Sequence, residues 1–109
     1  NSSSYCHIWA LYDLTSTSAT VTASSTASDP SLNMNMTTGD VMVIGGSTNA
    51  GGASVTATGW TVRITATDAM SVTQTAGDYT ATSDESPRTF TIDFSTAPSK
   101  NIGLAAAWR

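Results

Sequence analysis

Apolar residues alternate with Ser, Thr and other polar residues along most of this 109-residue chain. The clearest stretch is Phe90, Ile92 and Phe94, with Thr91 and Asp93 between them. Successive side chains of a β-strand point to opposite faces, so a two-residue period gathers the apolar side chains on one face. An antiparallel strand with one face on a core and the other in water has this pattern. The alternation therefore predicts a fold built from strands.

Turn residues interrupt the alternating segments at short intervals, for example at Asp29-Pro30 and Thr38-Gly39-Asp40. No segment keeps the 3.6-residue period that a helix of any size requires. Short strands with regular turns are typical of two-sheet β proteins. We expect an all-β, antiparallel β-sandwich, jelly-roll or immunoglobulin-like, with about seven to nine strands and no substantial helix.

Three segments carry local predictions. Residues 5–14 have bulky apolar side chains on both faces, which predicts a central strand covered on both sides. Residues 45–52 are the longest glycine-rich stretch and are expected to form a flexible loop. Ala76-Gly77-Asp78 has the composition of a hairpin turn, which would separate strands at 69–75 and 79–82.

The apolar stripes also predict which side chains form the core. Two Trp residues lie inside such stripes, and six other residues alternate cleanly enough to be assigned an inward face. The residues expected to be buried are Val43, Ile64, Phe90, Ile92, Phe94, Leu104, Trp9 and Trp108.

The length fits one domain, residues 1–109. The segment from Ile8 to Tyr12 is similar in character to the one from Gly103 to Arg109, because both contain small residues, a Leu and a late aromatic. Two interpretations follow. Either two central strands of one sheet share a composition, or residues 1–14 are the closing strand of an upstream module and residues 15–109 are a complete module.

Charge is scarce: charged residues make up 11% of the chain and the net charge is −4. A nucleic-acid-binding surface needs a cluster of basic residues, whereas Arg63, Arg88, Lys100 and Arg109 are far apart in the sequence. We therefore expect no nucleic acid partner. No apolar run approaches the ~18–20 residues of a membrane-spanning helix, and we expect no membrane partner either.

The sequence offers little for catalysis. A nucleophilic hydroxyl needs a histidine partner, and His7 is the only histidine, next to Cys6 in the expected first strand. Adjacent strand residues point to opposite faces, so these two cannot form a dyad, and His7 is interpreted as a packed or edge residue. The acids that would have to pair for glycosidase chemistry mostly lie at expected turns; they are Asp68, Asp78, Asp84, Glu85 and Asp93. We expect no enzyme, no catalytic residue and no cofactor.

Two binding hypotheses remain open from the residues. Asp78, Asp84 and Glu85 lie where turn carboxylates and backbone carbonyls would suit calcium, although solvated turn charge is the favoured interpretation of these residues. Trp60 and Tyr79 lie near expected strand starts and are candidates for stacking on a glycan. The alternative for Trp60 is a core residue that anchors the two sheets.

The order of several segments resembles that of a β-sandwich module in the virion structural proteins of tailed bacteriophages. The segments that carry the likeness are residues 8–12, 15–28, 38–44, 58–61, 89–95 and 104–109. The resemblance implies a building or display role at the virion surface, as capsid decoration or as part of a tail or fibre. It carries over no catalytic residue. The low charge, the apolar run from Val41 to Ile44 and the two-sided bulk of residues 5–14 predict contacts with other virion or filament subunits, as a homo-oligomer.

Two other functions are compatible with the sequence. The first is a glycan-binding adhesion module that recognises a host surface glycan. The second is a subunit of an extracellular protein filament at the bacterial cell surface, held by strand exchange with its neighbours.

Overall fold

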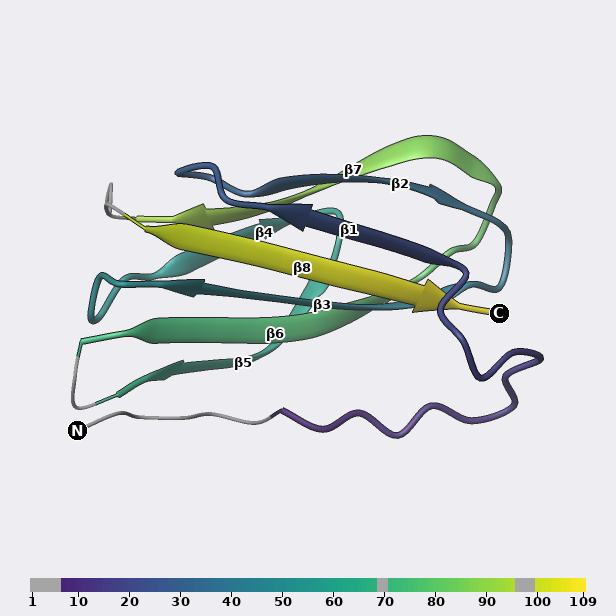
Figure 1. Ribbon diagram of the computed structural model, residues 1–109, viewed down its shortest axis with the longest axis horizontal. Helices are drawn as coiled ribbons and strands as arrows, with labels where there is room; N and C mark the ends of the chain where they lie inside the picture. Colours follow the sequence, from purple (N-terminus) through teal and green to yellow (C-terminus); the bar gives the residue numbers. More distant parts are fainter. Residues whose placement is uncertain (1–6, 69–70, 96–99) are drawn as a thin grey trace.

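The computed structural model describes residues 7–68, 71–95 and 100–109, and in these residues the chain forms two antiparallel β-sheets packed as a sandwich (Figure 1). The described residues contain no helix, which confirms the predicted fold class. The strands are β1 (Val21–Ser25), β2 (Ser31–Met36), β3 (Val41–Thr48), β4 (Val55–Thr58), β5 (Thr61–Thr67), β6 (Thr73–Thr80), β7 (Glu85–Phe94) and β8 (Asn101–Trp108).

The strands divide five and three between the sheets. The five-stranded sheet has the order β1-β8-β3-β6-β5, and the three-stranded sheet has the order β2-β7-β4. Consecutive strands mostly lie in different sheets, and β5 and β6 are the one pair that are neighbours both in sequence and in a sheet. The last strand, β8, lies inside the larger sheet, antiparallel to both β1 and β3.

The core lies between the sheets. Phe90, Ile92 and Phe94 of β7 are buried, as the sequence predicts. They pack with Leu32, Met34 and Met36 of β2 and with inward residues of the larger sheet, which are Met42 and Ile44 of β3 and Ala105 and Ala107 of β8. The β2 and β7 stripes follow the period-2 pattern because each of these strands buries one face only.

A pair of glycines lets the two sheets approach closely at the centre. Gly46 of β3 and Gly103 of β8 lie directly opposite each other in the ladder. A Cβ on Gly46 would lie 2.8 Å from Cδ1 of Ile92, and one on Gly103 would lie 3.3 Å from the same methyl group and 2.6 Å from Cβ of Pro30. The side chain of Ile92 therefore packs against the bare backbone of both strands.

This close approach explains why the prediction for Leu104 is wrong. On β8 the inward residues are Gly103, Ala105 and Ala107, whereas Leu104 is 53% exposed on the outer face. The side chains of a strand form two alternating sets, one on each face. An assignment that is wrong by one residue therefore places every side chain of the strand on the wrong face. Here the small set faces inward because Ile92 and Pro30 already occupy the space.

Val43 and Ile64 are also assigned to the wrong face by the sequence. Val43 is half-buried and lies opposite Ala106, and Ile64 is 41% exposed and lies opposite Ala76. Directly opposed residues of a ladder share a face, and these pairs lie on the outer face of the five-stranded sheet. Because only three strands cover the inner side, edge strand β5 is mostly exposed.

Glycine inside strands accounts for two further corrections. Residues 76–78 form no turn, because β6 runs without a break from Thr73 to Thr80. A Cβ on Gly77 would meet the carbonyl oxygen of Thr61 and lie 2.7 Å from Cζ3 of Trp60, so this glycine permits a close approach. Similarly, Gly45 and Gly46 belong to β3, and the predicted glycine-rich loop begins only after Thr48.

The predicted central strand at residues 5–14 is wrong where the structure describes it. Residues 7–14 form no strand, and the segment runs outside the two sheets (Figure 1). Ile8 is 87% exposed and Tyr12 is 81% exposed. The central positions of the larger sheet are filled by β8 and β3. The chain joins the sandwich at Thr15 and Ser16, whose N–H groups donate to the carbonyl oxygen of Arg109 at 2.6 and 2.9 Å.

Asp40, which is 1% exposed, connects three parts of the chain. Its Oδ1 accepts a hydrogen bond from Nε of Arg109 at 2.9 Å, and its Oδ2 accepts one from the N–H of Thr37 at 2.8 Å. Its backbone carbonyl accepts from the N–H of Ala81 at 2.9 Å. Burial alone would raise the pKa of Asp40, but the hydrogen bonds from Arg109 and Thr37 lower it by more, and the pKa lies below the ordinary value.

The first prediction contrasts the two faces. Replacing Phe90 by Ala should lower the free energy of unfolding by ~3–5 kcal/mol, since it leaves a cavity in the core. Replacing Leu104 by Ala should lower it by less than ~1 kcal/mol, because half of that side chain is in water. Urea unfolding of both variants provides the measurement, and equal losses would contradict the assignment of faces.

The second prediction concerns acid stability. A carboxyl group whose pKa is lowered by folding stabilises the protein above its unfolded pKa of ~4 and loses that contribution as the pH falls toward the folded value. Replacing Asp40 by Asn should lower the free energy of unfolding at pH 7 by about 1–3 kcal/mol. The variant should also lose stability less steeply below pH ~4.

Part of the acid slope should remain in this variant, because folding also lowers the pKa values of Asp78 and Asp84. Urea titrations between pH 7 and pH 3 would show parallel curves for the two proteins if Asp40 were not the coupled group.

Candidate functional site

The outer face of the five-stranded sheet carries a groove of about 760 Å³, called the outer groove below. Its floor consists of residues of β3, β6 and β8 that lie directly opposite one another and therefore share the outer face. Val43, Gly45 and Ser47 of β3 run along its middle. On one side, β8 contributes Ala106, Leu104 and Ile102 opposite them, and on the other side β6 contributes Ala76 and Gln74. Since Gly45 has no side chain, the floor is hollow between Ala76 and Leu104.

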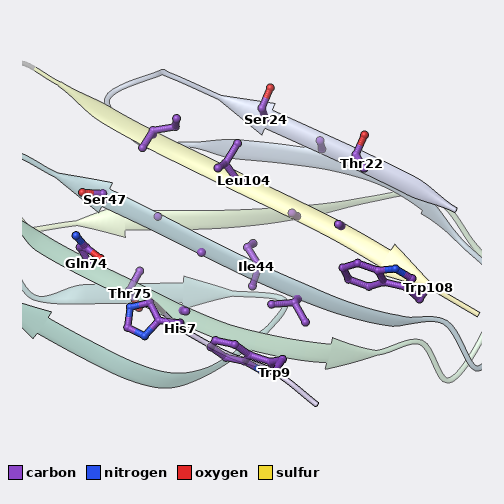
Figure 2. Close-up of a pocket in the computed structure, with 18 residues that line it drawn as sticks. His7, Trp9, Thr22, Ser24, Ile44, Ser47, Gln74, Thr75, Leu104 and Trp108 are labelled. Carbon is purple, nitrogen blue, oxygen red and sulfur yellow. The ribbon is translucent and has the colours of Figure 1, made fainter. Parts of the chain in front are cut away.

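Aromatic side chains line this groove on two sides. Trp108 comes from the end of β8, and His7 and Trp9 come from the segment that precedes the sandwich. Figure 2 shows Trp9 and Trp108 on the same face of the sheet, with His7 near Trp9. The rings of His7 and Trp9 pack edge to face, with their centroids 6.2 Å apart.

Asp78 of β6 lies near Trp9 and pairs with Arg63. Its carboxylate accepts hydrogen bonds from Nε and Nη2 of Arg63 at 2.7 and 2.8 Å and is also hydrogen-bonded to the side chain of Trp9. The Arg63 bond is the main reason why the pKa of Asp78 lies below its ordinary value. Asp78 therefore stays ionised near neutral pH.

The two groove tryptophans correct the prediction that Trp9 and Trp108 belong to the core. Both are half-buried and line the outer groove instead. Trp108 and Leu104 are an even number of residues apart on β8 and therefore lie on the same face. Because the small residues of β8 face the core, both of these side chains face outward. The signal was present in the sequence, because Gly103, Ala105 and Ala107 form an alternating set of small residues that suits a close inner contact.

The groove lining has no charged side chain apart from the titratable ring of His7. The floor is mostly apolar, with Ser47 and Gln74 at one end of it, and Thr22 and Ser24 of β1 add hydroxyl groups at the rim. Nε2 of His7 is buried and has no hydrogen-bond partner in the described part of the chain. An uncharged apolar floor with a neutral polar rim favours a neutral ligand over an ionic one.

The two residues considered for glycan stacking lie elsewhere. Trp60 is buried, and its indole N–H donates to the carbonyl oxygen of Thr91 at 2.8 Å. This is the core role that the sequence left open for it. The hydroxyl of Tyr79 donates to Oε1 of Glu85 at 2.7 Å, and the Arg88 guanidinium lies 4.2 Å from the centre of its ring. Burial, and then the Glu85 contact, raises the pKa of Tyr79.

The three calcium candidates each have a different protein partner. Asp78 pairs with Arg63, and Glu85 pairs with Arg88 at 2.6 Å. Asp84 accepts from the N–H and the hydroxyl of Thr38 at 2.8 and 2.9 Å. Among the described residues, no three His, Cys, Asp or Glu side chains gather into a group that could hold a metal ion.

The remaining acids of the glycosidase hypothesis lie apart from the groove lining. Asp68 accepts a hydrogen bond from the N–H of Val72 at 2.9 Å, as a turn carboxylate does. Asp93 is exposed on β7, in the other sheet. Cys6 lies outside the described residues.

Comparison with protein-family models, with curated proteins and with solved structures found no match. Within the described residues, no helix has the length and hydropathy needed to cross a membrane. The structure itself identifies an all-β, two-sheet sandwich domain, and the outer groove of this domain is lined by aromatic side chains.

A third prediction tests which face of β3 lines the groove. A Cβ on Gly45 would lie 3.3 Å from the Thr75 carbonyl oxygen and 3.7 Å from Cβ of Ala76, whereas one on Gly46 would press into Ile92. Replacing Gly46 by Ala should therefore lower the free energy of unfolding by ~1–3 kcal/mol through overpacking. Replacing Gly45 by Ala should change it by less than ~1 kcal/mol. Thermal unfolding of the two variants provides the comparison, and a larger loss at Gly45 would reverse the assignment.

Proposed function

We propose that this domain is a non-enzymatic structural module of a tailed-bacteriophage virion, either decorating the capsid or forming part of a tail or fibre. The observation that carries the proposal is the segment before the sandwich. The eight described strands all lie within residues 15–109, whereas residues 7–14 lie outside the sheets with the side chains of Ile8 and Tyr12 in water.

The exposed side chains of Ile8 and Tyr12 favour a contact between this segment and another protein surface. Ile8 and Tyr12 alternate with Trp9 and Leu11 in the manner of a strand, yet residues 7–14 pair with no strand of the described chain. Exposed apolar groups and unpaired extended backbone are the features through which β proteins contact neighbouring sheets. The proposal assigns this segment to a contact with an adjacent module or a second copy.

The surface composition supports a role in an assembled particle. Ser and Thr fill 36 of the 109 positions, and many of them are exposed. The surface therefore interacts with water mainly through hydroxyl groups and less through charged groups. With four Lys and Arg residues in the whole chain, close packing of copies would bring few basic groups together. The order of β-segments is similar to that of modules in virion structural proteins, and the observed sandwich agrees with that resemblance at the level of the fold.

The site chemistry supports a non-catalytic role. His7 is the only histidine, and its Nε2 has no hydrogen-bond partner among the described residues. Of the carboxylates that were considered for catalysis, Asp78 and Glu85 form ion pairs with arginines. Asp84 and Asp68 accept backbone hydrogen bonds at turns, and Asp93 is exposed to solvent. A nucleophile activated by a neighbouring base requires a different arrangement.

The fourth prediction tests assembly. Replacing Ile8 and Tyr12 together by Ser should leave the thermal unfolding midpoint unchanged, because both side chains are already in water, and should weaken association of the domain. Replacing exposed Thr56 of β4 by Ala serves as the control and should change neither property. Analytical ultracentrifugation over a range of concentrations measures association, and an intact chain that stays monomeric throughout would contradict the assembly role.

Localisation tests the virion assignment separately. Immunogold electron microscopy of purified phage particles should place an antibody against this domain on the head, tail or fibre. Labelling of filaments on the bacterial cell surface, with none on virions, would replace the virion assignment by the filament alternative.

A further inference from the structure

We propose that the outer groove is a binding site for a neutral glycan, in which Trp9 and Trp108 stack on sugar rings. This inference goes beyond the structural role proposed above and does not depend on it. The site lies on the outer face of β3, β6 and β8, on the opposite side of the sheet from the core.

The dimensions fit a small oligosaccharide. The volume of about 760 Å³ falls within the range of ~300–1,000 Å³ that is usual for ligand pockets. Trp9 lies near Asp78 of β6, and Trp108 belongs to β8, with β3 between these two strands. Because neighbouring strands are ~4.8 Å apart, β6 and β8 are separated by roughly 10 Å. This separation leaves room for a sugar ring on the floor between the two indoles (Figure 2).

The chemistry of the lining matches the two surfaces of a pyranose. A sugar ring has an apolar C–H face and an edge of hydroxyl groups. The indoles and the floor of Val43 and Leu104 offer apolar surface, and Ser47 and Gln74 at one end of the floor offer hydroxyl and amide partners.

The charges favour a neutral glycan over an acidic one. The lining contains no Lys or Arg, which are the usual partners of carboxylate and phosphate groups. Asp78 lies beside the groove and the whole chain has a net charge of −4. Because Asp78 is paired with Arg63, it is the net charge of the chain and the lack of a basic partner in the lining that disfavour an anionic ligand.

A peptide or a second copy fits this site less well. Strands β3, β6 and β8 each have a hydrogen-bonded neighbour on both sides, so the floor offers no open edge to which a peptide strand could add. Two copies of a concave surface cannot fill each other. A ligand at this site must instead be held by side chains, as a sugar is.

The test uses the indole N–H signals of the three tryptophans in a ¹H–¹⁵N NMR titration. The probes are neutral tetrasaccharides of glucose, galactose and N-acetylglucosamine, with tetragalacturonic acid as the acidic comparison. At least one neutral probe should shift the Trp9 and Trp108 signals saturably and leave the Trp60 signal in place, because Trp60 is in the core. The acidic probe should cause no saturable shift.

Matched variants complete the test. Replacing Trp9 or Trp108 by Ala should each weaken binding at least about tenfold, corresponding to ~1.4 kcal/mol. Replacing Tyr12 by Ala removes an exposed aromatic ring that does not line the groove, and affinity should be unchanged.

Several results would overturn the proposal. They are the absence of a saturable shift with every neutral probe, equal binding of the acidic probe, and equal loss of binding in the Tyr12 variant. Indole shifts that appear on raising the protein concentration without sugar would assign the groove to a second copy. None of these outcomes depends on where the domain is found in a virion.

Discussion

The contact of Ile92 with the paired glycines of β3 and β8 is the constraint on which the rest of the structure depends. Gly46 and Gly103 face each other across the ladder, and the Ile92 side chain fills the space that their missing side chains leave. The inward face of β8 must then be small, and its bulky residues turn outward. The apolar floor of the outer groove is thus a direct consequence of how closely the core is packed.

A second point of attachment lies at one end of the sandwich. Asp40 joins the turn between β2 and β3 to Arg109, and the carbonyl oxygen of Arg109 accepts hydrogen bonds from Thr15 and Ser16. Arg109, which directly follows β8, therefore contacts both the β2–β3 turn and the start of the sandwich. Because the Asp40 carboxylate is buried and charged, this end of the molecule depends on pairing as well as on apolar packing.

The sequence predicted the fold class and the β7 core correctly, because a strand that buries one face leaves an unambiguous period-2 stripe. It failed at β8, where both alternating sets are apolar and the choice of inward face depends on Pro30 and Ile92, which are distant in sequence. The prediction of a turn at Gly77 failed for a similar reason. This glycine is required by the close approach of Trp60, which the local sequence pattern does not reveal. The groove residues were missed because Trp9 and Trp108 were assigned to the core.

The position of β8 also has a consequence for synthesis on the ribosome. Of the eight described strands, β8 is translated last; it occupies a central position of the larger sheet, and β1 and β3 meet only through it. Until β8 emerges, a nascent domain has two strand edges without a neighbour, and such edges can pair with other chains. The five-stranded sheet therefore becomes continuous only after translation has passed β8, and chaperone protection would matter most during that interval.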